Sequence, residues 1–451
     1  MVLLTRDPES LTDMKKFWAY AAVLPLMWSS AAWAESNFSV SDAEVNAIYP
    51  DIEKVYIDLH EHPELSGHEV RTAAKLAEGL RTLGFEVTEH VGGTGVVGVM
   101  KNGAGPVVLL RTELDALPVL EKTGLPYASH VVVHNDQNVE VPVMHACGHD
   151  IHMSTWLGTG RLLAANKSHW SGTLVMIGQP AEETIGGADG MLKDGLYTRF
   201  PKPAYAVAIH DTSSLPAGEV GYNPGYTTSN ADSIDITVYG KGGHGSAPHT
   251  TIDPIVIGSR IVLTLQTLVS RETTPGDFAV VTVGTFHAGT KNNIIPDEAK
   301  LQLTVRSYSA EVRKRLLAGI ERIANAEAEA AGADKMPLIE RVEGADAVYN
   351  DPELAKRVMT AVGTRLGGNN VIQTPPITAS EDFSEYGREG VPTFMMWVGA
   401  IEPGKFKAAM QSGERLPSPH SSLFAPDRER TLKTAILAET AMVLSLLGPA
   451  K

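Results

Sequence analysis

The sequence predicts an α/β protein that carries a second, smaller domain of the ferredoxin-like type as an insertion. Between residues 41 and 226, short apolar segments alternate with helical ones, a pattern typical of layered α/β folds. Between residues 227 and 342 the order becomes β-α-β-β-α-β, which is the split βαβ arrangement. We therefore expect residues 41–226 and 343–451 to form one discontinuous domain around the 227–342 insertion.

The first part of the chain is expected to begin with two helices. Ser41 and Glu44 have the spacing of a capping box. Helical periodicity continues to Leu83, and Gly84 fits the position after a helix end. Strand-like segments follow at residues 85–88, 95–100, 107–111, 174–178 and 204–210, with a helix expected at 153–165. Open α/β sheets build their sites at the carboxyl ends of strands, where several of these segments have polar clusters, so we expect the functional site there.

The inserted part is recognised by alternation and by its helix starts. Residues 233–239, 278–286 and 299–307 alternate apolar and polar side chains, as half-buried strands do. Pro254 suits the first position of a helix that we expect to run to Val269. An amphipathic helix at 309–331 and a strand at 337–342 complete the insertion, and the returning chain should form helices at 352–366 and 427–447.

Composition and charge exclude several classes of partner. The 451 residues are 43% hydrophobic and 20% charged, as in ordinary soluble globular proteins. The net charge of -15 argues against nucleic acid and anionic membranes as partners. In so acidic a protein, a substrate carboxylate would need a local positive group to bind.

The N-terminus has the features of a signal peptide. Lys15 and Lys16 form a positive region, residues 17–28 are mainly apolar, and the sequence A-W-A at 32–34 places small side chains at a cleavage site. We expect residues 1–34 to be removed on export, to a bacterial periplasm, with no stable membrane insertion afterwards. The alternative is an N-terminal membrane anchor, although the apolar stretch is short for a bilayer span.

The single cysteine of the chain indicates a metal site. Cys147 and His149 stand two residues apart, and we expect their side chains to project from one face of an extended segment. Thiolate sulfur and imidazole nitrogen suit zinc and neighbouring transition metals. Alone, the pair would equally fit a buried thiol beside a structural histidine. The adjacent carboxylates Glu182 and Glu183 favour a metal site, because one can bind metal while the other moves protons.

Several motifs occur in a fixed order along residues 45–450. They are DALP at 115–118, HACGHD at 145–150, QPAEE at 179–183, GGHGSAPH at 242–249, NIIP at 293–296, SEDF at 380–383 and a late histidine, His420. This ordered set resembles the hippurate hydrolase, aminoacylase and auxin-conjugate amidohydrolase family of di-metal peptidases. The resemblance implies a zinc-peptidase-like α/β/α catalytic domain with a mixed central sheet, and a ferredoxin-like lid that often dimerises.

The resemblance also implies a cofactor and a set of ligands. Two divalent metal ions per subunit are expected; a thiolate with imidazoles favours zinc, and manganese, cobalt and nickel are alternatives. The residues that match the family's ligands are Cys147, His149, Glu183, His210 and His420. Glu182 matches the general base, which takes a proton from a metal-activated water and passes it to the leaving nitrogen. Asp115 matches the acid that orients a ligand. Glu113 stands where distant relatives have a histidine ligand, which argues against a ligand from that strand.

The lid carries further candidates. His244 matches a histidine that supports the oxyanion, often in the partner subunit's site. Asn293 matches a residue that polarises the substrate, and Arg306 could pair with a substrate carboxylate. The segment 210–214 lacks the aromatic residues often found there, and Ile151 replaces a frequent glycine. Both departures lie near the expected pocket, so the acyl preference of relatives does not transfer.

We therefore expect an amidohydrolase that cleaves N-acyl or N-aroyl amino acids, acting as a homodimer through the lid domain. A metallo-dipeptidase or carboxypeptidase with the same residues is the enzymatic alternative. A non-catalytic binding protein is a third possibility, which the intact ligand set and Glu182 disfavour.

Export should leave a defined N-terminus. If residues 1–34 are a cleaved signal peptide, intact-mass analysis of protein from the periplasm should show Glu35 as the first residue. Protein that keeps Lys15 and Lys16 and sediments with membranes would instead identify an anchor.

Overall fold

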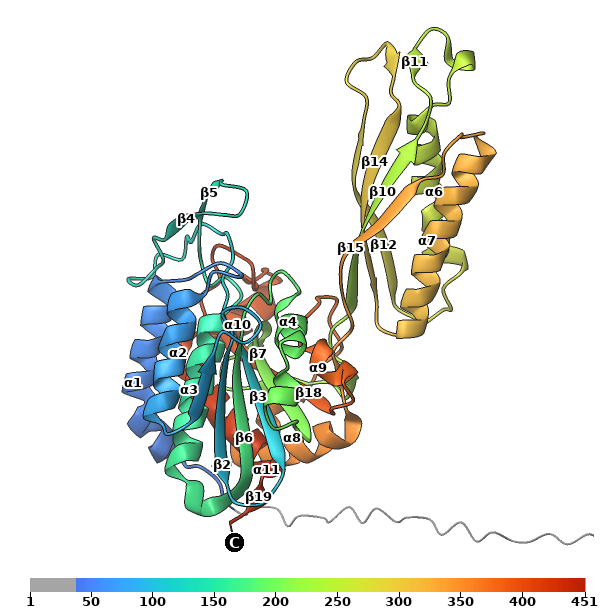
Figure 1. The fold of residues 1–451 in the computed structure, drawn as a ribbon. Coiled ribbons are helices and arrows are strands. Elements are labelled where there is room, and N and C mark those ends of the chain that lie inside the picture. The colour runs from blue at the N-terminus through green and yellow to red at the C-terminus, as the bar shows by residue number, and fades with distance from the viewer. Residues whose placement is uncertain (1–37, 451) are drawn as a thin grey trace, which may run out of the picture. The chain divides into compact units, whose positions relative to one another are not determined.

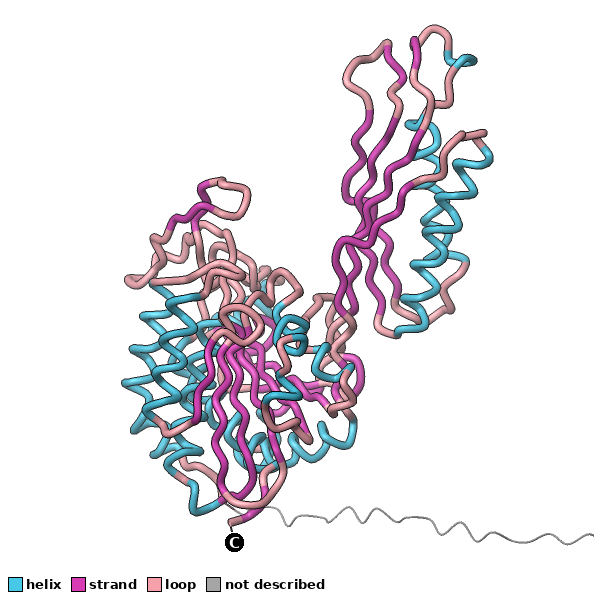
Figure 2. The backbone as a smooth tube through the Cα atoms, viewed as in Figure 1, coloured by secondary structure: helices cyan, strands magenta, loops and turns pink. Residues whose placement is uncertain are grey.

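The computed structural model describes residues 38–450, and the segment 1–34 lies outside these described residues (Figures 1 and 2). The main structural element is a mixed sheet with the strand order β1-β2-β6-β3-β7-β18-β8-β17, and β19 pairs with β6. Its strands are β1 (Glu86–Glu89), β2 (Val96–Asn102), β3 (Val107–Glu113), β6 (Trp170–Gln179), β7 (Tyr205–Pro216), β8 (Val220–Tyr222), β17 (Val371–Gln373), β18 (Thr393–Ile401) and β19 (Gly448–Pro449). The central strands β6, β3, β7 and β18 run parallel, whereas β2 is antiparallel to β6 and β8 to β18. The expected α/β fold with a mixed sheet is confirmed.

Helices cover both faces of this sheet (Figure 1). One face packs against α1 (Asp42–Glu61), α2 (Val70–Thr82), α3 (His149–Ala165), α8 (Pro352–Leu366) and α11 (Arg428–Leu446). The other face is covered by α4 (Gly187–Lys193), α5 (Leu196–Arg199) and α9 (Ser384–Arg388). Successive strand residues point to opposite faces. Accordingly, in β6 Leu174 and Met176 join the first core, and Val175 and Ile177 join the second.

A second, four-stranded antiparallel sheet forms within residues 230–345, with the order β12-β14-β10-β15, so its last strand runs past the expected boundary at 342. Its elements follow the chain as β10 (Asn230–Tyr239), α6 (Pro254–Arg271), β12 (Ala279–Ala288), β14 (Glu298–Ser307), α7 (Ala310–Ala330) and β15 (Leu338–Ala345). The sheet and its two helices share a hydrophobic core of their own. This is the β-α-β-β-α-β order that the sequence predicts. The domain boundaries at 226 and 343 stay predictions, as does the action of the inserted domain as a lid.

Capping residues explain why helix starts were predictable. The Ser41 hydroxyl accepts the Glu44 N–H, and the Glu44 carboxylate accepts the Ser41 N–H, which confirms the capping box. The side chain of Asp253 caps α6, and Pro254 occupies its first turn, as expected. Strand ends were predicted less well: β6 begins at Trp170 rather than at 174, because its first residues pair with both β2 and β19.

The remaining elements are short. They are β4 (Val132–His134), β5 (Glu140–Pro142), β9 (Gly225–Tyr226), β11 (Gly243–His244), β13 (Ile294–Ile295), β16 (Tyr349–Asn350) and α10 (Pro403–Ser412), with 3-10 turns at Lys167–His169, Pro248–Thr250 and Gly368–Asn370. The sequence reading did not predict the β4–β5 hairpin, whose strands are only three residues long. Among the described residues, none of the helices combines the length and the apolar character that a membrane span requires.

Candidate metal centre

The predicted ligands meet at the carboxyl ends of parallel strands, as expected. Asp115 follows β3, the pair Glu182 and Glu183 follows β6, and His210 lies in β7. These three strands are neighbours in the sheet and run in the same direction, so their carboxyl ends reach the same edge. The loop before α11 brings His420 to the same place, where the His420 N–H donates to the Ala146 carbonyl at 2.7 Å.

The Cys147–His149 segment is a turn and not the extended segment that we expected. Gly148 adopts a left-handed conformation with φ 79°, and α3 begins at His149, four residues earlier than predicted. A Cβ atom at Gly148 would lie 2.3 Å from Oδ2 of Asp211, so glycine is required both for the backbone conformation and for the space. The prediction failed because strand periodicity does not describe a helix start.

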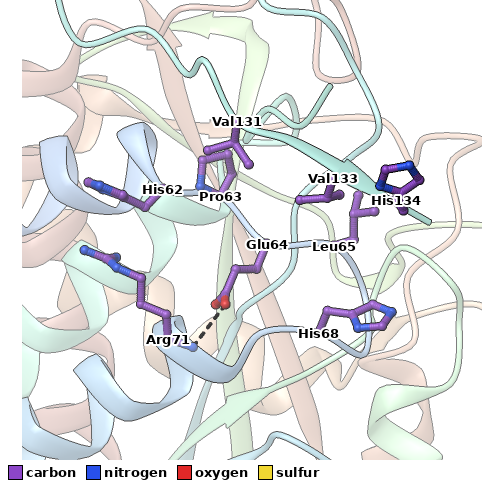
Figure 3. Close-up of a pocket in the computed structure, with 9 residues that line it drawn as sticks. All are labelled: His62, Pro63, Glu64, Leu65, His68, Arg71, Val131, Val133 and His134. Carbon is purple, nitrogen blue, oxygen red and sulfur yellow. Dashed lines mark hydrogen bonds between the residues drawn. The ribbon is translucent and has the colours of Figure 1, made fainter. Parts of the chain in front are cut away.

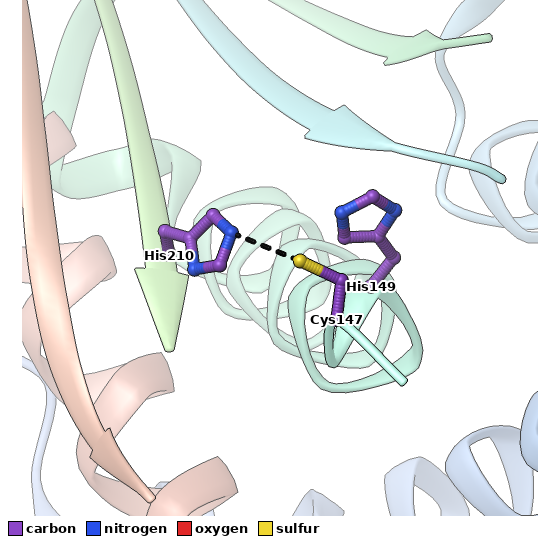
Figure 4. A group of neighbouring side chains, drawn as sticks. All are labelled: Cys147, His149 and His210. Atoms are coloured by element: carbon purple, nitrogen blue, oxygen red, sulfur yellow. Dashed lines mark hydrogen bonds between the residues drawn. The ribbon is translucent and has the colours of Figure 1, made fainter. Parts of the chain in front are cut away.

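The five predicted ligands nevertheless lie together. Figure 4 shows Cys147 and His210 pointing toward one another, with Sγ 3.5 Å from Nε2 of His210, and His149 beside them. Glu183 lies between two histidines: one of its carboxylate oxygens is 3.9 Å from Nε2 of His149, and the other is 3.5 Å from Nε2 of His420. Donor atoms of Cys147, His149 and His210 form one compact group, and those of Cys147, Glu183 and His420 form another. Cys147 belongs to both groups, which suits a ligand shared between two ions.

The tautomers of two histidines are set by backbone carbonyls. Nδ1 of His149 donates to the Asp115 carbonyl, and Nδ1 of His210 donates to the Asp211 carbonyl, each at 2.7 Å. Each ring therefore presents the lone pair of Nε2 to the cluster, which is how metal-binding histidines are commonly held. Among the described residues, Nε2 of His149 is buried and finds no hydrogen-bond partner. A buried polar atom without a partner is costly, and a metal ion would satisfy it.

The carboxylates show the same lack of compensation. Within the described part of the chain, Oε1 of Glu183 is likewise buried without a hydrogen-bond partner. Burial, together with repulsion from Glu381 and Glu183, raises the pKa of Glu182 well above its usual range. Burial also raises the pKa of the Cys147 thiol, and the nearby Glu183 and Glu182 add to this effect. Acidic groups crowded into a buried space favour a divalent cation, which would stabilise their charged forms. The donor set thus fits two metal ions.

Asp115 contacts both halves of the cluster. Its carboxylate accepts hydrogen bonds from the Ser66 hydroxyl at 2.6 Å and from the Glu183 N–H at 3.0 Å. Its carbonyl accepts Nδ1 of His149. Asp115 can therefore orient one ligand through its backbone and another through its side chain, as the orienting role requires.

A buried arginine was missed by the sequence reading. Arg111 pairs with Glu113, with Glu381 at 2.7 Å and with Asp382 at 3.1 Å. Glu113 also lies 3.1 Å from Nδ1 of His152. Burial would raise the pKa of Glu113, but Arg111 and His152 hold it well below its usual range. Arg111 and His152 thus compensate the charge of Glu113, but its donor atom also groups with those of His149 and His152, so the absence of a ligand role stays a prediction. For Arg111, a charged residue in an apolar strand was the available signal.

The cluster opens into a cavity of about 620 Å³. Besides the predicted ligands Cys147, Glu183, His210 and His420 and the predicted base Glu182, the lining includes Ile185, Thr212, Ser213, Thr228, Arg306, Ile377, Met395 and Trp397. Arg306 forms no ion pair within the part of the chain that the structure describes, although it lines this acidic cavity. A separate pocket of about 330 Å³ lies between the α1–α2 connection and β4 and contains none of the predicted ligands (Figure 3).

His244 and Asn293 lie near each other but not in this cavity. His244 pairs with Ile294 between β11 and β13, and the neighbouring Gly245 N–H donates to the Asn293 carbonyl at 2.9 Å. Both side chains are exposed, and neither belongs to the lining of the metal cavity. The structure therefore brings these two predicted residues to one another, and of the three predicted lid residues it places Arg306 alone in the lining of the metal cavity.

Comparison with known proteins places the chain in a family. Residues 109–417 match the family described as peptidase family M20/M25/M40. Thermostable carboxypeptidase 1 of Saccharolobus solfataricus is 37% identical over 391 residues, which cover 86% of this chain and 93% of that protein. Hippurate hydrolase of Campylobacter jejuni is 37% identical over 342 residues, 75% of this chain and 86% of that protein. Among solved structures, the chain resembles the Bacillus subtilis YXEP protein, which is described as a dinuclear metal binding peptidase from the M20 family. The two chains are 29% identical, and their structures align with a TM-score of 0.70 over 88% of this chain and 98% of the YXEP chain. The chain therefore belongs to peptidase family M20/M25/M40 and is a hydrolase that acts on amide bonds.

Proposed function

We propose that this hydrolase cleaves N-acyl or N-aroyl amino acids to a carboxylic acid and a free amino acid. The observation that carries the proposal is the cavity of about 620 Å³, in which Arg306 and the uncompensated acidic donors face the same space. Arg306 has no carboxylate partner of its own among the described residues, so it can accept a substrate carboxylate in a bidentate pair. The scissile amide would then lie at the donor cluster, beside Glu182.

The chain's own residues account for the proton transfers. Glu182 is 7% exposed, and one of its oxygens is 3.9 Å from Nε2 of His149, so it adjoins the donor cluster. As general base, Glu182 takes a proton from the attacking water and delivers it to the leaving nitrogen. The bound ions supply Lewis acidity toward the carbonyl and lower the pKa of water. We propose zinc, because a thiolate with imidazole donors matches its borderline softness, with manganese, cobalt or nickel as alternatives.

The inserted segment is proposed to act as a lid and as a dimer interface. Strand β12 is an edge of the small sheet, and unpaired edges favour association. On α6, Val256 is 54% and Leu263 is 72% exposed, seven residues apart and thus on one face. Burial of this apolar face in a homodimer would remove it from water. His244 would then support the oxyanion and Asn293 the substrate carbonyl, in the same subunit or its partner. We propose export to the periplasm as the location of this activity.

A carboxypeptidase activity is the second candidate, and the likeness to thermostable carboxypeptidase 1 favours it. A C-terminal amino acid of a peptide and the amino acid of an N-acyl conjugate present the same carboxylate to Arg306. The two activities differ in what lies on the acyl side of the amide. Thr212, Ser213 and Ser214 line the cavity with small hydroxyl side chains, and we propose that they lie on the acyl side of the substrate.

A substrate screen with metal analysis tests the proposal. Purified protein should hydrolyse N-acetyl, N-benzoyl or indole-acetyl amino acids faster than dipeptides, and the same sample should contain two divalent ions per chain. Replacement of the substrate carboxylate by an amide should raise KM, because Arg306 loses its partner. Faster cleavage of dipeptides than of every N-acyl amino acid would favour the peptidase alternative.

Glu182→Gln should separate proton transfer from metal binding. The variant should fold, keep its metal content, and lose roughly 10²–10⁴-fold in kcat, as expected for a general base. Glu183→Gln is the matched comparison: it removes a proposed ligand next in the chain, so metal content should fall together with activity. Full activity of Glu182→Gln would exclude its role as the base.

Cys147 gives a direct measure of metal occupancy, because it is the only cysteine. A metal-bound thiolate should resist iodoacetamide, whereas chelator-treated protein should take up one alkyl group, measured by whole-protein mass. Labelling should need alkaline conditions, since burial raises the pKa of the Cys147 thiol. Alkylation should then prevent metal rebinding, and Cys147→Ser should remain unlabelled as a control. Equal labelling of holo- and apo-protein would remove Cys147 from the ligand set.

A further inference from the structure

The carboxylate pair stands on a turn with an unusual backbone. Ala181 and Ile185, on either side of Glu182 and Glu183, both have φ 52°. This left-handed region is disfavoured for residues with a Cβ atom, and most strongly for β-branched residues such as isoleucine. Backbone of this kind persists where surrounding contacts impose it, and it is found most often at functional sites.

A carboxylate from a distant segment contacts this turn. Glu69, which directly precedes α2, is fully buried. Its Oε1 accepts the Ala181 N–H at 2.9 Å and the Gly67 N–H at 2.7 Å, and its Oε2 accepts the Thr94 hydroxyl at 2.5 Å. Burying a carboxylate is costly unless hydrogen bonds compensate its charge. In the described chain these donors are its compensation, because Glu69 forms no ion pair there.

Two other carboxylates hold the same turn from its other end. Asp115 accepts the Glu183 N–H, and Asp382 accepts the Ala188 N–H, each at 3.0 Å. Of the three, only Glu69 bonds to the left-handed residue that immediately precedes Glu182. Of these three carboxylates, Glu69 also lies outside both the group of predicted metal ligands with Asp115 and the set of carboxylates that pair with Arg111.

We propose that Glu69 is a positioning residue for Glu182. By accepting the Ala181 N–H, it holds the turn in the conformation that directs the Glu182 carboxylate toward the donor cluster. The inference rests on the proposed role of Glu182 as the general base. Glu69 would act on the rate of proton transfer and not on the binding of metal or substrate.

Glu64 offers a matched control. It lies five residues before Glu69 and also accepts backbone N–H groups, those of Arg71 at 3.1 Å (Figure 3) and Thr72 at 2.8 Å. These bonds cap the start of α2, and the Glu64 side chain has no contact with the turn at 180–187 among the hydrogen bonds of the described residues. Glu64→Ala should therefore lower stability without reaching Glu182.

Hydrogen exchange tests the contact independently of any substrate. In metal-free protein, the amide of Ala181, followed in peptides spanning 178–188, should exchange faster in Glu69→Ala than in the wild type. Glu64→Ala should leave this exchange unchanged. Because the readout needs neither metal nor turnover, unchanged exchange in Glu69→Ala would overturn the inference even if the proposed amidohydrolase activity is found. Altered exchange in a protein that hydrolyses no N-acyl amino acid would count against the proposed function alone.

A double-mutant cycle tests whether Glu69 acts through Glu182. Glu69→Ala should lower kcat by roughly 10–100-fold, with KM and metal content nearly unchanged, since misplacing a catalytic group by about 1 Å has an effect of this order. Glu69→Gln, which keeps an acceptor oxygen for the Ala181 N–H, should recover most of the loss. In a Glu182→Gln background, Glu69→Ala should cause little further loss. An equal loss in both backgrounds, or a loss confined to KM or metal content, would overturn the proposal.

If Glu69→Ala does not fold, Thr94→Val provides the same cycle with a smaller expected loss in kcat, because it removes one hydrogen-bond donor to the Glu69 carboxylate.

Discussion

Burial of negative charge at one edge of the sheet is the constraint on which the functional region depends. Cys147, Glu182 and Glu183 bring acidic groups into a largely buried space, and several surrounding polar atoms have no hydrogen-bond partner among the described residues. Such a cluster is costly unless its groups are protonated or a positive charge compensates them. The Bacillus subtilis YXEP protein is described as a dinuclear metal binding peptidase, and two cations at the donor atoms of this chain would compensate the acidic groups. The same cations would supply the chemistry for amide cleavage, so that stability and catalysis would depend on the same atoms.

Arg111 divides the acidic residues into two sets. Its guanidinium forms ion pairs with Glu113, Glu381 and Asp382, whereas Glu182 and Glu183 form none with it in the described chain. Of the paired residues, Glu381 also lines the cavity, and its negative charge helps to raise the pKa of Glu182. Arg111 thus partly compensates one group of buried carboxylates, without lining the cavity itself.

The sequence predicted elements well where local chemistry determines them. The cap at Ser41, the proline at Pro254 and the alternation of β10 are properties of a few neighbouring residues, and the structure agrees with each. The segment around Gly148 was wrongly predicted as extended, and the steric limit that Asp211 places on position 148 comes from more than sixty residues away. The Arg111 and Glu69 contacts were not predicted for the same reason, since both join segments over a hundred residues apart. The family resemblance pointed to the five predicted donors and to Asp115, but not to Arg111 or Glu69.

The contact between His420 and Ala146 has a consequence for the order in which the site is assembled. The main-chain bond between them joins the HACGHD motif to a loop only about thirty residues from the C-terminus. A ribosome or a secretion channel releases the N-terminal part first. The first donor group, Cys147, His149 and His210, has emerged when more than half of the chain is still missing, whereas the second requires His420. The two donor groups therefore become available at different stages of chain synthesis, and the second is completed only when the loop at His420 has joined the HACGHD motif.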